Sequence, residues 1–97
     1  MIIEKTDIYE EWFSKLKNLA AKIRIIKRLE RIENNNFGDV KSVGDGIYEI
    51  RIDFGCGYRI YFSYKNKVII LLLCGGDKST QQKDIEKAKI INKELGN

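Results

Sequence analysis

Apolar side chains recur every three or four positions in the first third of the chain, which is the spacing of one helix face. The first set is Ile8, Trp12, Phe13, Leu16, Leu19 and Ala20. The second set, which follows an interruption at Asn18, is Ile23, Ile26, Leu29 and Ile32. Thr6 or Asp7 can cap the first helix, and the asparagines and glycine within residues 34–38 can end the second. We therefore expect two helices after a short opening strand over residues 1–5.

Apolar and polar residues alternate in the middle of the chain, which is the pattern of half-buried strands. Across residues 48–54 the even positions are apolar and the odd positions are charged, and the alternation resumes over residues 58–64. Two glycines lie in the intervening residues 55–57. This predicts a hairpin with a three-residue loop, in which one sheet face packs in the core and the other faces water.

The remaining segments complete the order of elements. Residues 68–74 are continuously apolar, as expected for a strand covered on both faces, and Gly75 and Gly76 are expected to end it. Ser79, with Gln82 three residues on, predicts the start of a last helix, and a further strand is expected near residues 39–43. The order strand, helix, helix, four strands, helix predicts a single α+β domain over residues 1–97.

The composition narrows the chemistry that this domain can perform. The 97 residues carry a formal net charge of +4, which attracts polyanions but is also common among small soluble proteins. No histidine is present, which excludes Ser-His-Asp and Cys-His nucleophiles and histidine metal sites. Two cysteines are too few for a disulfide framework or zinc site, so a reduced, cytoplasmic setting without metal or cofactor is expected. Neither a signal peptide nor a stretch of roughly 20 apolar residues is apparent.

The polar face of the predicted hairpin collects the candidate catalytic residues. With a three-residue loop, Asp53 would face Arg59, and Arg51 would face Tyr61. Lys78 would arrive from the end of the next strand. Guanidinium groups bind phosphate oxygens through paired donors, so this cluster suits attack on an RNA phosphodiester by the neighbouring 2′-hydroxyl. The alternative is an ordinary cross-strand ion pair between Arg59 and Asp53, which would contribute only about 0 to 1 kcal/mol.

The second predicted helix has a basic side. Its members are Lys22, Arg24, Lys27, Arg28 and Arg31. These residues could contact RNA, but charged residues on an exposed helix face are also the normal arrangement. The pattern leaves both interpretations open.

Several motifs together resemble a known toxin family. The segments VGDGIYEIRIDFGCGYRIYF and VIILLLCGGDKSTQ, in this order, closely resemble the HigB-like addiction-module killer proteins of the RelE/ParE toxin superfamily. The segments EEWFSKL and AAKIRIIKRLERI extend the resemblance through nearly the whole chain. The resemblance implies a small twisted antiparallel sheet with helices packed against it.

The resemblance also implies a function. Many members of this superfamily are messenger RNA endonucleases that act on the ribosome. A cognate helix-turn-helix antitoxin silences them, and they would contact operator DNA only through that antitoxin. The family's functional basic residues fall on Arg51, Arg59 and Lys78. This chain departs from RelE in having Glu49 in place of a strand lysine, and in lacking a clear counterpart of its C-terminal tyrosine. The identity of the general base, whether a lysine or a carboxylate such as Glu49, therefore stays open.

Two rival functions fit the same resemblance. A ParE-type protein would poison DNA gyrase and would not need a phosphodiester-cleaving cluster. A degenerate, non-toxic member would only bind its antitoxin and the operator complex. Expression of the protein would separate the three functions. An RNA endonuclease would arrest growth and cleave messenger RNA, a gyrase poison would arrest growth and cause DNA breaks, and a non-toxic member would not arrest growth.

Overall fold

The first third of the chain forms two helices, as its apolar spacing predicts. After β1 (Ile2–Lys5), α1 spans Asp7–Lys15 and α2 spans Leu19–Glu33. The Thr6 hydroxyl accepts a hydrogen bond from the backbone N–H of Tyr9 at 3.1 Å, and the Asn18 side-chain oxygen accepts one from Ala21 at 3.1 Å. These two residues cap the helix starts, so the expected interruption at Asn18 is confirmed.

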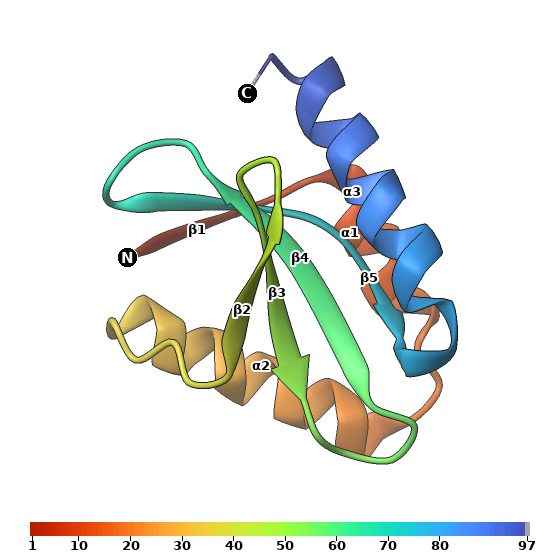
Figure 1. Ribbon diagram of the computed structural model, residues 1–97. Coiled ribbons are helices and arrows are strands. Elements are labelled where there is room, and N and C mark those ends of the chain that lie inside the picture. The colour runs from red at the N-terminus through yellow and green to blue at the C-terminus, as the bar shows by residue number, and fades with distance from the viewer. Residues whose placement is uncertain (97) are drawn as a thin grey trace.

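The alternating middle of the chain forms a meander of four strands, followed by the last helix. The computed structural model describes residues 1–96, and Asn97 of the predicted domain lies outside them. The strands are β2 (Val40–Gly44), β3 (Ile47–Ile52), β4 (Tyr58–Tyr64) and β5 (Ile69–Asp77), and α3 (Gln81–Glu94) follows a short 3-10 turn, Lys78–Thr80. The predicted element order and the α+β class are confirmed (Figure 1).

All five strands belong to one sheet in the order β1-β5-β4-β3-β2. Neighbouring strands from β2 to β5 pair antiparallel, but β1 pairs with β5 in parallel, with Ile3 beside Ile70. The sheet is therefore mixed: the expected antiparallel pairing is confirmed from β2 to β5, and the edge strand β1 departs from it. The parallel pair arises because the two helices carry the chain across the sheet before it enters β2.

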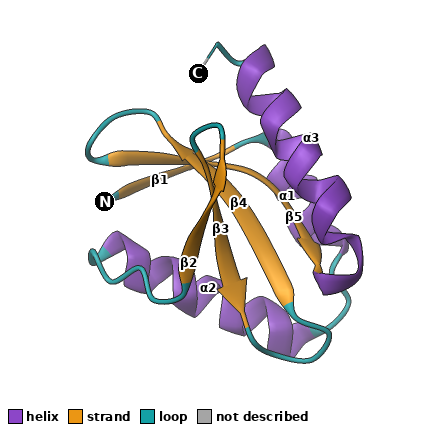
Figure 2. Ribbon diagram, in the orientation of Figure 1, coloured by secondary structure: helices purple, strands orange, loops and turns teal. Residues whose placement is uncertain are grey.

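Helices cover both faces of the sheet (Figure 2). On one face α1 and α2 bury the larger core, in which Tyr9, Ile25 and Ile32 pack against Ile50 and Phe62. On the other face Ala88 and Ile91 of α3 pack over a second cluster with Tyr61, Leu73 and Cys74. The face of β3 and β4 that carries their charged residues is therefore partly covered by a helix, and Glu49 on it is fully buried.

Several helix positions differ from the prediction: Leu19 and Ala20 of the first expected set begin α2 and are exposed, and part of the second set is exposed as well. Ile25 is fully buried in α2, whereas Ile23 and Ile26, which were expected to face the core, are each 45% exposed. The stripe was placed too far round the helix because four isoleucines lie within α2 and its spacing admits more than one face. The exposed pair leaves apolar surface beside the basic side chains of this helix.

Gly75 and Gly76 continue β5 instead of ending it. A Cβ on Gly75 would lie 2.4 Å from the Trp12 ring, and one on Gly76 would lie 1.9 Å from a carboxylate oxygen of Asp84. The Trp12 ring leaves no room for a side chain at Gly75, whereas a side chain at Gly76 would require the Asp84 carboxylate to shift, so the two glycines let α1 and α3 approach the strand closely. This extension carries β5 as far as Asp77, and Lys78 opens the turn that follows.

A candidate phosphate-binding pocket

The hairpin of β3 and β4 sets the two candidate arginines side by side. Arg51 pairs directly with Arg59, and Glu49 pairs with Tyr61. The loop spans residues 53–57, because Phe54 and Gly57 already make turn hydrogen bonds. The predicted register, with Asp53 opposite Arg59, is therefore wrong by two residues. A shift of two keeps every side chain on its expected face, so the arginines still share one surface.

Arg51, Arg59 and Lys78 surround one open hollow at the end of the hairpin. The hollow has a volume of about 260 Å³ and is lined by Asp39, Arg51, Ile52, Asp53, Gly57, Arg59 and Lys78. The backbone N–H of Lys78 donates a hydrogen bond to the Gly57 carbonyl oxygen at 2.8 Å, which holds the end of β5 against the hairpin loop. We call this hollow the cation pocket. The structure thus brings together three of the four predicted catalytic residues.

Gly57 is needed at the wall of the cation pocket. Its φ angle is +80°, a left-handed value that favours glycine, and an added Cβ would lie 3.3 Å from Nη1 of Arg59. The same residue offers its carbonyl oxygen to Nη1 of Arg59 at 3.4 Å. The loop therefore shapes the pocket and restrains the arginine at once.

The two arginines differ in how firmly they are held. The Arg59 side chain is only 11% exposed, and its Nε lies 3.7 Å from Oε2 of Glu49. The Arg51 side chain is 40% exposed, with Nε at 3.8 Å from Glu49 Oε1 and 3.9 Å from Asp39 Oδ2. Arg59 is thus firmly held in the wall of the pocket, while Arg51 borders solvent.

Tyr61 lies below the pocket and does not line it. Its side chain is fully buried, and its hydroxyl donates a hydrogen bond to Oε2 of Glu49 at 3.0 Å. Burial, followed by the neighbouring Glu49 carboxylate, raises the pKa of Tyr61 far above its usual range. The expectation that this face of the hairpin is wet is wrong at Glu49 and Tyr61, which are fully buried and which α3 covers, and holds at Arg51, so Tyr61 stays protonated beneath the site.

Four of the five predicted RNA-binding residues of α2, namely Arg24, Lys27, Arg28 and Arg31, line a second hollow of about 510 Å³, Arg28 from a buried position. Ile52 and Asp53 line both hollows, so the second one adjoins the cation pocket. We call the second hollow the α2 groove.

Lys22 lies apart from the α2 groove. Its ammonium group donates a hydrogen bond to the Ser14 carbonyl oxygen at 3.3 Å and lies 5.2 Å from the centre of the Phe13 ring. The contact with α1 directs it away from the candidate site. The structure therefore does not group Lys22 with the other cations of α2.

Arg28 is a structural residue. Only 9% of it is exposed, and its guanidinium donates to the carbonyl oxygens of Phe37, Asp39 and Arg51 at 2.7 to 3.1 Å. Burial is the largest influence on this side chain and lowers the pKa of Arg28. The prediction that Arg28 belongs to the exposed basic side is wrong, because these carbonyl groups draw it under the loop that enters β2.

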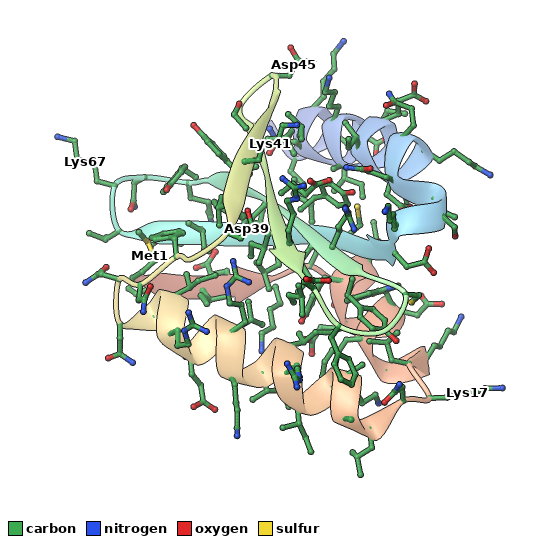
Figure 3. All side chains as sticks on the ribbon, turned by 60° about the horizontal axis from the view of Figure 1, so that its bottom comes forward. Met1, Lys17, Asp39, Lys41, Asp45 and Lys67 are labelled. Atoms are coloured by element: carbon green, nitrogen blue, oxygen red, sulfur yellow. The ribbon has the colours of Figure 1, made fainter. Side chains whose placement is uncertain are left out.

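Three residues of the site escaped the sequence interpretation. Asp39 lines the cation pocket, Gly57 shapes it, and Gln81 donates a hydrogen bond to Glu49 Oε2 at 2.9 Å. Asp39 lies at the entrance to β2, well separated from Lys17 and Lys67 (Figure 3). The EIRI motif at residues 49–52 indicated the position of the pocket in the sequence. No sequence pattern indicated Gln81, because nothing in the sequence showed that α3 covers this face.

The described residues show no sign of a metal site or of a membrane span. Within residues 1–96, no three His, Cys, Asp or Glu side chains cluster to hold a metal ion. None of the helices in this range has the length and apolar character needed to cross a membrane. Both cysteines, exposed Cys56 and buried Cys74, are free.

The fold matches that of E. coli toxin RelE. A double arginine mutant of that toxin in the free state superposes with a TM-score of 0.68 at 16% identity, covering 92% of this chain and 93% of that chain. A chain of the intact E. coli RelBE toxin-antitoxin complex gives a TM-score of 0.62 at 20% identity, covering 78% of this chain and 94% of that chain. The mixed sheet with helices on both faces is therefore a RelE-like α+β domain.

The family follows from the sequence comparison. This chain belongs to the family described as Phage derived protein Gp49-like (DUF891), whose profile matches residues 11–95. An uncharacterized protein of Haemophilus influenzae is 56% identical over 94 residues, covering 97% of this chain and 95% of the relative. The cation pocket and the α2 groove both lie within the matched range.

Proposed function

We propose that this chain is the toxin of a type II toxin–antitoxin system, of the HigB-like kind, and that it cleaves messenger RNA on the ribosome. The observation that carries the proposal is the cation pocket, where Arg51, Arg59 and Lys78 from three separate segments line one open hollow. Membership of the Gp49-like family and the RelE-like fold support the same assignment. The reaction needs neither metal nor cofactor.

The pocket suits phosphodiester cleavage by an adjacent 2′-hydroxyl. The 2′-oxygen bonds to phosphorus as its proton passes to a base, and the bond to the 5′-oxygen breaks as that oxygen takes up a proton. The products are a 2′,3′-cyclic phosphate and a 5′-hydroxyl end. Arg59 and Arg51 are assigned to the negative charge that develops on the phosphate oxygens, and the Lys78 ammonium is assigned to protonation of the 5′-oxygen. The carboxylates of Asp39 and Asp53 are the proton acceptors that line the pocket.

The α2 groove extends the binding surface for the RNA strand. Arg24, Lys27 and Arg31 can bind consecutive phosphates, because the groove adjoins the pocket along Ile52 and Asp53. Arg24 is also stacked over the Phe54 ring, with its guanidinium carbon 4.5 Å from the ring centre. The groove would therefore lead the strand toward the scissile phosphate at the pocket.

Mapping of RNA ends after a pulse of expression tests this function. Wild type should produce new 5′ ends within coding regions, and the double variant Arg51→Ala/Arg59→Ala should produce none. The matched control is Lys17→Ala/Lys67→Ala, which also removes two positive charges but from exposed positions far from the pocket. The control should cleave as wild type does.

The other outcomes of this experiment reject the proposal. Growth arrest without RNA cleavage, accompanied by gyrase-linked DNA breaks and a DNA damage response, would identify a ParE-type gyrase poison. Harmless expression of a chain that still binds its partner would identify a non-toxic binding module for the antitoxin and the operator complex.

We also propose that a cognate helix-turn-helix antitoxin covers α2 and reaches operator DNA on behalf of the toxin. The exposed apolar residues of this helix are Leu19 at 69% and Ile23 and Ile26 at 45%. They lie beside the cations of the α2 groove, so an acidic amphipathic segment would match both features and block the RNA. Such a protein is expected from the adjacent open reading frame.

Co-purification with the protein of that adjacent frame tests the antitoxin surface. The variant Ile23→Glu/Ile26→Glu should recover at least about 10-fold less partner than wild type, because it places two carboxylates against an acidic segment. Ile90→Glu is the control, since Ile90 is a 59% exposed apolar residue on α3. Equal capture by all three proteins would place the antitoxin elsewhere.

A further inference from the structure

The carboxylate of Glu49 lies beneath the cation pocket and has no access to solvent. Its side chain is fully buried in the middle of β3. Glu49 Oε2 accepts hydrogen bonds from the Tyr61 hydroxyl at 3.0 Å and from the Gln81 amide at 2.9 Å. A group enclosed in this way cannot receive a proton from a bound RNA, so Glu49 is not the general base.

The contacts of Glu49 with the arginines are of another kind. The Nε atoms of Arg51 and Arg59 lie 3.8 and 3.7 Å from its two oxygens, within ion-pair range. Neither Glu49 Oε1 nor Arg59 Nε makes a hydrogen bond with the described residues. The attraction is therefore electrostatic and depends on the charge of the carboxylate, while the contacts with Tyr61 and Gln81 depend on an oxygen acceptor.

A counter-charge is needed at this point of the sheet. Arg51 and Arg59 are directly opposite each other on neighbouring strands, where like charges repel. Glu49 lies one pair back on the same face and attracts the Nε edge of both guanidinium groups. The terminal nitrogens of Arg59 are left near the pocket, where the Gly57 carbonyl oxygen is their only acceptor among residues 1–96.

We propose that Glu49 is a positioning residue that holds Arg59, and through it the cation pocket, in a phosphate-binding geometry. Its negative charge orients the Nε edge of Arg59 inward, so the two terminal nitrogens face the RNA phosphate. The hydrogen bond from Gln81 ties the first turn of α3 to the same carboxylate. The activity part of this inference rests on the proposed function.

The variant Glu49→Gln separates charge from hydrogen bonding. The remaining oxygen can still accept from Tyr61 and Gln81, but the attraction for the arginines is lost. We expect the Arg59 Nε–H group, observed by NMR, to become more mobile than in wild type. We expect the single-turnover cleavage rate of ribosome-bound messenger RNA to fall roughly 10- to 100-fold, because a misplaced group costs this much. The apparent KM should change less than about 3-fold, since Lys78 and the α2 groove are untouched.

Three further variants make the test specific. Asp45→Asn removes a 75% exposed carboxylate from the β2–β3 turn and should leave both readouts as in wild type. Tyr61→Phe keeps the charge of Glu49 and should leave Arg59 ordered. Glu49→Asp should give an Arg59 mobility and a cleavage rate between those of wild type and Glu49→Gln, because its carboxylate is retained but lies farther from Arg59. This variant also tests the inference if Glu49→Gln does not fold.

A double-mutant cycle decides whether Glu49 acts through Arg59. In an Arg59→Ala background, Glu49→Gln should slow cleavage no further. An equal additional loss in that background, or an Arg59 signal as ordered in Glu49→Gln as in wild type, would overturn the inference. If wild type does not cleave RNA, the proposed function fails, and the mobility of Arg59 alone then decides whether Glu49 positions it.

Discussion

Replacing Arg28 with methionine is expected to lower the free energy of unfolding by about 3 kcal/mol. The guanidinium joins two segments, because it donates to the backbone carbonyl oxygens of Phe37 and Asp39 in the loop that enters β2 and to that of Arg51 in β3. Methionine fills similar space but supplies no donor, so the carbonyl oxygens of Phe37 and Arg51 lose this partner, while that of Asp39 keeps the backbone N–H of Arg51 at 3.0 Å. Gly38, whose added Cβ would lie 3.0 Å from this guanidinium, shows how closely the loop encloses it. Chemical denaturation monitored by circular dichroism gives the change.

The neighbouring lysine provides the control for this prediction. Lys27→Met removes a charge from the same helix at an exposed position, and its effect should stay within about 0.5 kcal/mol. Arg28→Lys should fall between the two, because one ammonium group cannot reach acceptors in three directions. Stability equal to wild type in Arg28→Met would show that the loop entering β2 holds its place without the guanidinium.

The architecture could be predicted from the sequence because each element has a clear local signal. The interruption between the helices was expected at Asn18, which the structure shows to be the cap of α2, and the β3–β4 alternation located both arginines on one face. The parallel pairing of β1 with β5 could not be predicted from local pattern. It depends on where α1 and α2 carry the chain, which is decided by packing across the whole sheet.

The errors in the site have one physical origin. Glu49 and Arg28 were interpreted as exposed because charged residues are rarely buried without partners. Their partners are Tyr61 and Gln81 in one case and three carbonyl oxygens in the other, and neither set is visible from spacing. Burial of a charge becomes predictable only when the register and the covering helix are known.

The predicted grouping of Arg51, Arg59 and Lys78 was nevertheless unaffected by these errors. The hairpin register was wrong by two residues, an even shift that leaves Arg51 and Arg59 on the same face. Lys78 arrives beside them even though the two glycines extend β5 instead of ending it, because its backbone bonds to Gly57. Side-chain alternation determined the cluster, and long-range contacts determined how each member is held.

Arg51 and Arg59 are held differently, so replacing each with lysine should reduce RNA cleavage to a different extent. Arg59→Lys is expected to reduce the single-turnover rate of RNA cleavage by about 100-fold, within the range for loss of one donor to a developing oxyanion. The side chain is 11% exposed, so a lysine there is confined but cannot offer two parallel donors to the phosphate. Arg51→Lys should cost less than about 10-fold, because the 40% exposed side chain is free to adjust and acts mainly through its charge.

The ratio between these two losses is the informative quantity, since both variants keep the net charge. Lys67→Arg, an exchange in the opposite direction at an exposed turn, should cleave as wild type does. Raising the salt concentration should weaken binding of all variants alike, because the phosphate contacts of α2 are common to them. Equal losses in Arg51→Lys and Arg59→Lys would mean that charge alone is required, and the bidentate role of Arg59 would be withdrawn. A much larger loss for Arg59→Lys would show that the fixed geometry of its guanidinium, and not only its charge, contributes to cleavage.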